Sequence, residues 1–84
     1  MKSQSEEIKY TFMNRLIKKG VEANNIPLFL RDLKNSFFIY PSSDHKQIGS
    51  VMNQLGWYDI ELDYQTFQLA KAYFDTLRFV GSQN

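Results

Sequence analysis

The 84-residue chain contains no cysteine, which excludes disulfide scaffolds, cysteine-ligated zinc sites and thiol nucleophiles. Its four glycines are isolated from one another, so no glycine-rich phosphate-binding loop is present. No apolar run approaches the roughly 18 residues that a membrane-spanning helix needs. The first residues also lack the apolar core of a signal peptide. Together with the absence of cysteine, these features predict a cytoplasmic protein without a membrane anchor.

The net charge is only +1, which is too small to indicate nucleic acid or an anionic membrane as a partner. What the chain does contain is aromatic residues, at 15% of the sequence. Aromatic rings bury a large area for few rotatable bonds, which suits a domain short of core volume. The length predicts one domain over residues 1–80, followed by a disordered tail at 81–84.

Helical apolar spacing, bounded by start and stop signals, predicts four helices at residues 3–19, 25–40, 44–55 and 63–79. Ser3, Asp44 and Asp63 are the expected N-caps, and Gly20 and Gly56 the expected stops. The segment 21–25 is predicted to be a short polar connection. Residues 57–62 alternate apolar and acidic side chains but have no partner strand, so they are predicted to form an ordered loop packed by Trp57. The fold class is therefore all-α, a compact orthogonal bundle of four short helices.

The last predicted helix is apolar on two faces. One stripe, predicted to fill the core, consists of Phe67, Ala70, Phe74 and Leu77. The second face is the candidate interface for self-association; its residues are Leu69, Tyr73, Phe79 and Val80. The alternative is that this face completes the core of the monomer. Phe38 and Tyr40 add further apolar surface after the second helix.

No catalytic pattern is evident. His45 is the only histidine, and although Ser42 and Ser43 precede it, no distant residue is placed to orient its ring. The same turn has the amide groups and Lys46 that an anion site would use, but an N-cap carboxylate at Asp44 would compete with any anion. The favoured interpretation of this turn is structural.

No metal or cofactor site is predicted either. Asp59, Glu61 and Asp63 alternate like the start of a calcium-binding loop. That loop needs glycine at its sixth position and glutamate at its twelfth, where this chain has Tyr64 and Ala70. The three acids are better interpreted as loop residues and a helix cap.

Residues 47–73 have the outline of a helix-turn-helix, which leaves a DNA-binding regulator as the alternative function. The connection between the two helices is longer than the usual turn of three or four residues. The second helix also offers a nearly neutral face, although phosphate neutralisation supplies much of the affinity for DNA. Five cations elsewhere would serve as backbone contacts if they share a face: Arg15, Lys18, Lys19, Arg31 and Lys34. Nucleic acid is therefore a possible but not a favoured partner.

The stretches at residues 26–31 (IPLFLR), 55–57 (LGW) and 61–64 (ELDY) resemble a group of short, uncharacterised bacterial proteins of similar length. The resemblance implies a bacterial helical domain and brings no activity, ligand or site residue with it. From the residues alone, we predict a non-enzymatic protein-interaction or regulatory module that self-associates as a homodimer or binds another protein, without a cofactor.

Overall fold

The computed structural model describes residues 4–82, and the surroundings of individual side chains for residues 6–77. In this part of the chain the fold is all-α, as predicted, and it contains no strand. A short 3-10 turn at Ala23–Asn25 leads into the second helix. The four helices are α1 (Gln4–Lys19), α2 (Ile26–Ile39), α3 (His45–Gln54) and α4 (Tyr64–Ser82). None of them combines the length and the apolar composition that crossing a bilayer requires, within residues 4–82.

Glycine ends α1 and α3 as the sequence predicts. Gly20 and Gly56 have φ of 108° and 109°, a backbone conformation that side chains with a Cβ disfavour. After α1, the amide of Val21 donates to the carbonyl of Leu16 at 3.0 Å. This bond reaches back over five residues and is typical of a helix closed by glycine, because it satisfies a carbonyl that the helix leaves open.

The predicted helix starts are also found where the structure describes them. The Asp44 carboxylate accepts a hydrogen bond from the amide of Gln47 at 2.9 Å, so Asp44 is the N-cap of α3. Pro27 occupies the first turn of α2, where the missing N–H costs nothing. The predicted cap at Ser3 lies outside the described residues.

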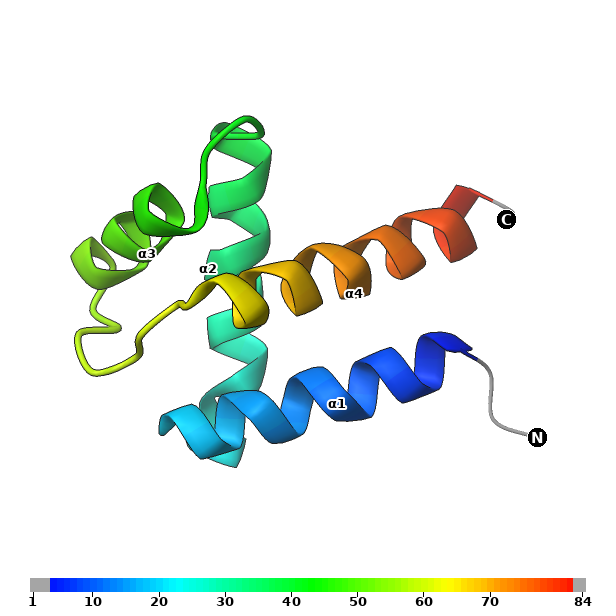
Figure 1. Ribbon diagram of the computed structural model, residues 1–84, viewed down its shortest axis with the longest axis horizontal. Coiled ribbons are helices and arrows are strands. Elements are labelled where there is room, and N and C mark those ends of the chain that lie inside the picture. The colour runs from blue at the N-terminus through cyan, green and yellow to red at the C-terminus, as the bar shows by residue number, and fades with distance from the viewer. Residues whose placement is uncertain (1–3, 83–84) are drawn as a thin grey trace.

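In space, α1 and α4 lie side by side and antiparallel, and α2 crosses both of them steeply (Figure 1). The short helix α3 packs on α2. The core lies where these helices meet. It consists of Phe12, Leu16, Val21, Phe29, Leu33, Ile48, Met52, Leu62, Phe67, Ala70 and Tyr73.

Three local predictions are wrong. Val21 was assigned to a polar connection, but it is buried in the core, because the backbone turns inward after Gly20. The third helix is predicted to include Leu55, but Leu55 lies beyond the last helical residue and is exposed. The tail was expected to begin at residue 81, whereas α4 continues through Gly81 and Ser82. Residues 83–84 lie outside the described chain.

The segment between α3 and α4 is an ordered loop, as predicted. The Trp57 ring packs edge-on against Phe29, with 5.0 Å between ring centroids. Its Nε1 donates a hydrogen bond to Oδ2 of Asp32 at 3.0 Å. Both partners belong to α2, so this loop is anchored to the helix that also carries α3.

Candidate interaction surface

The structure places the predicted interface of α4 inside the monomer where it describes that face. Tyr73 is only 9% exposed, and its ring lies 5.5 Å from the ring of Phe12 in α1. Leu69 is half-buried against the core. The side chains of Phe79 and Val80 lie outside the described residues. An exposed interface at Leu69 and Tyr73 is therefore wrong, and these two residues complete the monomer core.

The reason is the position of α4 between two other helices. One side of α4 faces α1 through Tyr73, while Phe67 and Phe74 contact Phe37 of α2 with ring centroids 5.5 and 5.7 Å apart. A helix with neighbours on both sides needs two apolar faces. Leu77, which was assigned to the core stripe, is instead 46% exposed.

An exposed apolar groove lies between the end of α2 and the second half of α4. A hollow of about 410 Å³ lies between the two helices, and its lining is mostly apolar. A second hollow of about 260 Å³ shares Phe37 and Phe74 with the first, so the two are continuous. We call this surface the α2–α4 groove. It is lined by Lys34, Phe37, Phe38, Phe74 and Leu77 and continues past Pro41, Lys71 and Asp75.

Phe38 forms one wall of the groove and is 86% exposed. Successive helical residues are about 100° apart around the axis, so of the pair Phe37 and Phe38 only one can face the core. Phe37 takes that place, and Phe38 is left in water at an estimated cost of about 1.5–3 kcal/mol relative to full burial. Phe38 and Tyr40 are the additional apolar surface that the sequence predicts after the second helix, and Tyr40 is also exposed.

Charges of both signs line the groove. Lys34 borders the larger hollow, and Lys71 and Asp75 border the smaller one. The Lys71 ammonium lies 5.1 Å from the centre of the Phe67 ring, which holds this cation close to the aromatic wall. The groove therefore has an apolar floor and a rim that carries two cations and one anion.

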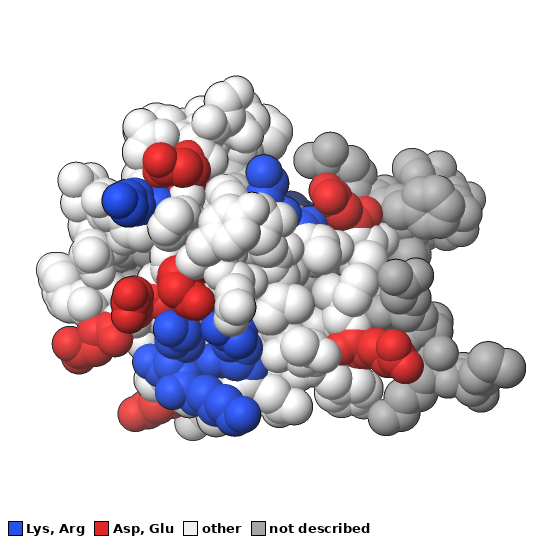
Figure 2. All heavy atoms as spheres, viewed as in Figure 1, with Lys and Arg blue, Asp and Glu red and all other residues white. Residues whose placement is uncertain are grey.

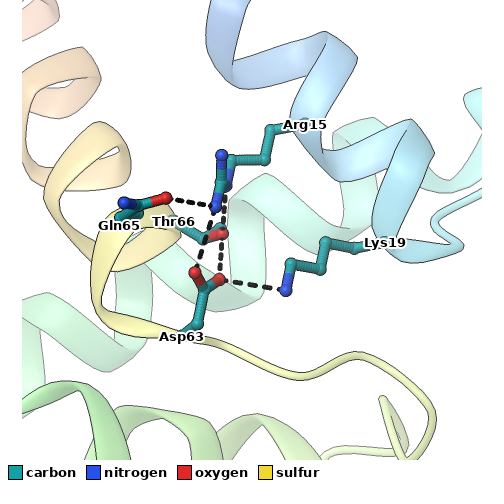
Figure 3. Close-up of polar contacts among 5 residues, drawn as sticks. All are labelled: Arg15, Lys19, Asp63, Gln65 and Thr66. Carbon is teal, nitrogen blue, oxygen red and sulfur yellow. Dashed lines mark hydrogen bonds and ion pairs between the residues drawn. The ribbon is translucent and has the colours of Figure 1, made fainter.

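A polar network joins α1 to the beginning of α4, at the opposite end from the groove (Figure 3). Oδ2 of Asp63 accepts a hydrogen bond from Arg15 Nη2 at 3.1 Å, and Oδ1 lies 3.1 Å from Nζ of Lys19. The Thr66 hydroxyl also donates to Asp63 Oδ1, and it accepts a bond from Arg15 Nε at 2.8 Å. Gln65 accepts a further bond from Arg15.

This network sets the protonation of Asp63. Burial by itself would raise the pKa of the Asp63 carboxyl. Hydrogen bonds from Thr66, Lys19 and Arg15, together with the charge of Lys19, outweigh burial and hold the pKa well below its ordinary value. Asp63 is therefore ionised across the physiological range, and its role is to hold α4 against α1.

The same contacts bear on the DNA-binding alternative. Basic side chains gather over the C-terminal half of α1, with acidic side chains beside them (Figure 2). Arg15 and Lys19 both lie at 3.1 Å from Asp63, and Arg31 lies at 3.4 Å from Asp32. Three of the five proposed phosphate contacts therefore already have carboxylate partners, which reduces the charge available to a phosphate backbone.

The helix pairing also departs from a helix-turn-helix. In the structure α3 packs mainly on α2, while α4 packs mainly on α1, so α3 and α4 are not each other's main packing partners. The pair that does pack across a short connection is α2 and α3. Of the residues in α3, only Lys46 is a lysine or arginine.

His45 lies at the start of α3, as predicted, with its ring 5.7 Å from that of Tyr64 and 6.2 Å from that of Phe67. It borders a hollow of about 360 Å³ with a mixed lining that also includes Lys46, Asn53 and Leu62. In the described part of the chain, no three histidine, aspartate or glutamate side chains are grouped closely enough to hold a metal ion. Glu61 and Asp63 border this hollow together, and Asp63 also contacts Arg15 and Lys19 of α1.

Comparisons of the chain with protein-family models, with curated protein sequences and with solved structures give no match.

Proposed function

We propose that this chain is a non-enzymatic protein-interaction module whose contact surface is the α2–α4 groove. The observation that carries the proposal is Phe38, which is 86% exposed on the wall of an apolar hollow of about 410 Å³. Single exposed apolar residues are common on protein surfaces, but an exposed ring next to an apolar hollow marks a contact site. Tyr58 is 77% exposed but lines none of the described hollows, so it is a single exposed apolar residue and does not mark a contact site.

The groove suits the side chain of a protein partner. Pockets for small molecules commonly measure about 300–1,000 Å³, so a hollow of about 410 Å³ has room for one large side chain. Here the apolar walls come from Phe37, Phe74 and Leu77, and the polar groups are the charges on the rim. Aromatic anchors surrounded by polar rims carry most of the binding energy in protein interfaces.

The titratable residues that line the groove are Lys34, Lys71 and Asp75. Catalysis needs a nucleophile or base held by an orienting partner within hydrogen-bond reach. No ion pair or hydrogen bond joins these three side chains, so the groove supports binding rather than chemistry. The expected setting, the cytoplasm of a bacterium, follows from the absence of cysteine and from the sequence resemblance.

A probe that imitates an aromatic side chain tests this proposal without a known partner. Toluene would be titrated into the isotope-labelled full chain while amide, methyl and aromatic shifts are followed by NMR. We expect the changes to concentrate on Phe37, Phe74 and Leu77, and Phe38→Glu to reduce them. Changes that instead follow exposure, with Tyr58 and Tyr64 affected as strongly as the groove, would contradict the proposal.

A further inference from the structure

The α2–α4 groove carries both a projecting side chain and a recess that can receive one. Phe38 protrudes from it, and the hollow beside Phe38 is about 410 Å³. A cavity of about 150 Å³ is already large enough for a benzene molecule. The hollow can therefore receive a phenyl ring such as the one that stands at its edge.

We infer that the partner of this groove is a second copy of the chain, with Phe38 of each copy seated in the hollow of the other. This inference rests on the proposed function. A two-fold interface brings together the same surface from both copies, so it requires a projection and a recess on one patch. The α2–α4 groove meets this requirement, whereas an unrelated partner would need only the recess.

The charges on the rim favour the same occupant. A rim of one sign would be repelled by its own copy and would attract an oppositely charged partner instead. Here Lys34 and Lys71 accompany Asp75, so each copy offers an anion to the cations of the other. The small excess of positive charge limits the affinity without preventing the pairing.

The available area indicates a weak dimer. Phe38 and Leu77 are 86% and 46% exposed, which amounts to roughly 250 Å² of apolar surface per copy when an aromatic side chain presents about 200 Å². Two copies would bury roughly 500 Å² of this apolar surface, which is below the roughly 1,200 Å² in total at which specific, stable interfaces begin, so the pairing is expected to be weak and transient. A Kd of about 100 μM, between the micromolar and millimolar marks, is the expected result.

Sedimentation equilibrium of the full chain, from about 10 μM to 1 mM, tests the pairing. We expect a reversible dimer, and we expect Phe38→Glu and Leu77→Glu each to raise its Kd at least about tenfold, which corresponds to 1.4 kcal/mol. The matched control is Tyr58→Glu, because Tyr58 is 77% exposed and lies outside the groove. It should leave the Kd unchanged. Both Phe38 and Leu77 are exposed, so circular dichroism should show unchanged helicity in all three variants.

The seating of Phe38 needs a separate measurement. In a mixture of labelled and unlabelled chains, isotope-filtered NOEs report only contacts between copies. We expect such NOEs from the Phe38 ring to the Leu77 methyl groups. A wild-type chain that stays monomeric at 1 mM, or a dimer that Phe38→Glu leaves intact, would overturn the inference. If toluene still binds the groove in that case, the proposed function stands and the partner is a different protein.

Discussion

Asp63→Asn is the most informative single substitution for the stability of this fold. The Asp63 carboxylate at the start of α4 contacts both Arg15 and Lys19 of α1. It also accepts a hydrogen bond from the hydroxyl of Thr66. Asparagine keeps the shape and one acceptor oxygen but removes the charge. The substitution therefore isolates the electrostatic part of the link between the two helices.

The expected loss at neutral pH is about 1–2 kcal/mol of the free energy of unfolding. Exposed ion pairs contribute about 0.2–1 kcal/mol each, and hydrogen bonds to charged groups about 1.5–3 kcal/mol. The side chains of Arg15 and Asp63 are 32% and 28% exposed, which places this network between the two cases. For a domain of this size, 1 kcal/mol corresponds to a shift of about 4–8 °C in Tm.

The dependence on pH distinguishes charge from packing. Because the folded-state pKa of Asp63 is lowered, the charged carboxylate stabilises the protein above the unfolded-state pKa of about 3.9. That contribution is lost as the pH falls below this value. The difference between wild type and Asp63→Asn should therefore be largest above about pH 5 and shrink towards pH 2.

Urea unfolding followed by fluorescence of Trp57, the single tryptophan, measures this difference at each pH. Asp59→Asn is the matched control, since Asp59 is an exposed acid of the same loop. In a double-mutant cycle, Lys19→Met and Asp63→Asn should be coupled by about 0.5–1 kcal/mol. The argument fails if Asp63→Asn has the same effect at pH 2.5 as at pH 7, or if Asp59→Asn matches it throughout.

Three further outcomes follow from the structure. Tyr73→Ala should lower the free energy of unfolding by about 3–4 kcal/mol, because Tyr73 belongs to the core. Leu77→Ala should change it by no more than about 0.5 kcal/mol, and urea unfolding measures both variants. Thermal unfolding should show that Gly56→Ala destabilises the protein by about 1–2 kcal/mol through its positive φ, while Gly49→Ala, inside α3, should stabilise it by up to about 1 kcal/mol. Selection from random DNA duplexes should enrich no motif, since specific sites are commonly bound at about 10⁻⁸–10⁻¹¹ M; one enriched motif would restore the helix-turn-helix interpretation.

Helix boundaries were predictable because the signals for them are local. Gly20 and Gly56 take a backbone conformation that glycine favours, and the Asp44 carboxylate accepts the amide three residues later. Each signal acts within one turn of helix, so no knowledge of the remaining fold is needed. All four helices that the sequence predicts are present. The main difference is the C-terminal end of α4, which is predicted at residue 79 and lies at Ser82 in the structure.

Which residues of α4 are buried could not be predicted, because their burial depends on how many helices surround α4. The sequence shows two apolar faces, which fits a central helix as well as a helix shared with a partner. In the structure α4 contacts α1 through Tyr73 and contacts α2 through Phe67 and Phe74, and Tyr73 is buried while Leu77 is exposed. That arrangement is a property of the whole bundle, and the periodicity of one segment does not contain it.

The polar network around Asp63 could be predicted only in part. Arg15 and Lys19 are four residues apart, which places both cations on one face of α1 and indicates a common acidic partner. The loop before α4 offers three acids, and the sequence alone does not choose among them. The structure brings Asp63 to this face, since Asp63 directly precedes α4 and α4 packs along α1.

These contacts also explain why the groove is at the far end of α4. The beginning of the helix is fixed to α1 through Asp63, and its middle is fixed by Tyr73 against Phe12 and by Phe67 against Phe37. Beyond this point α4 extends past the steeply crossing α2, so the two helices diverge and leave apolar side chains uncovered (Figure 1). The same crossing that completes the core thus creates the exposed groove.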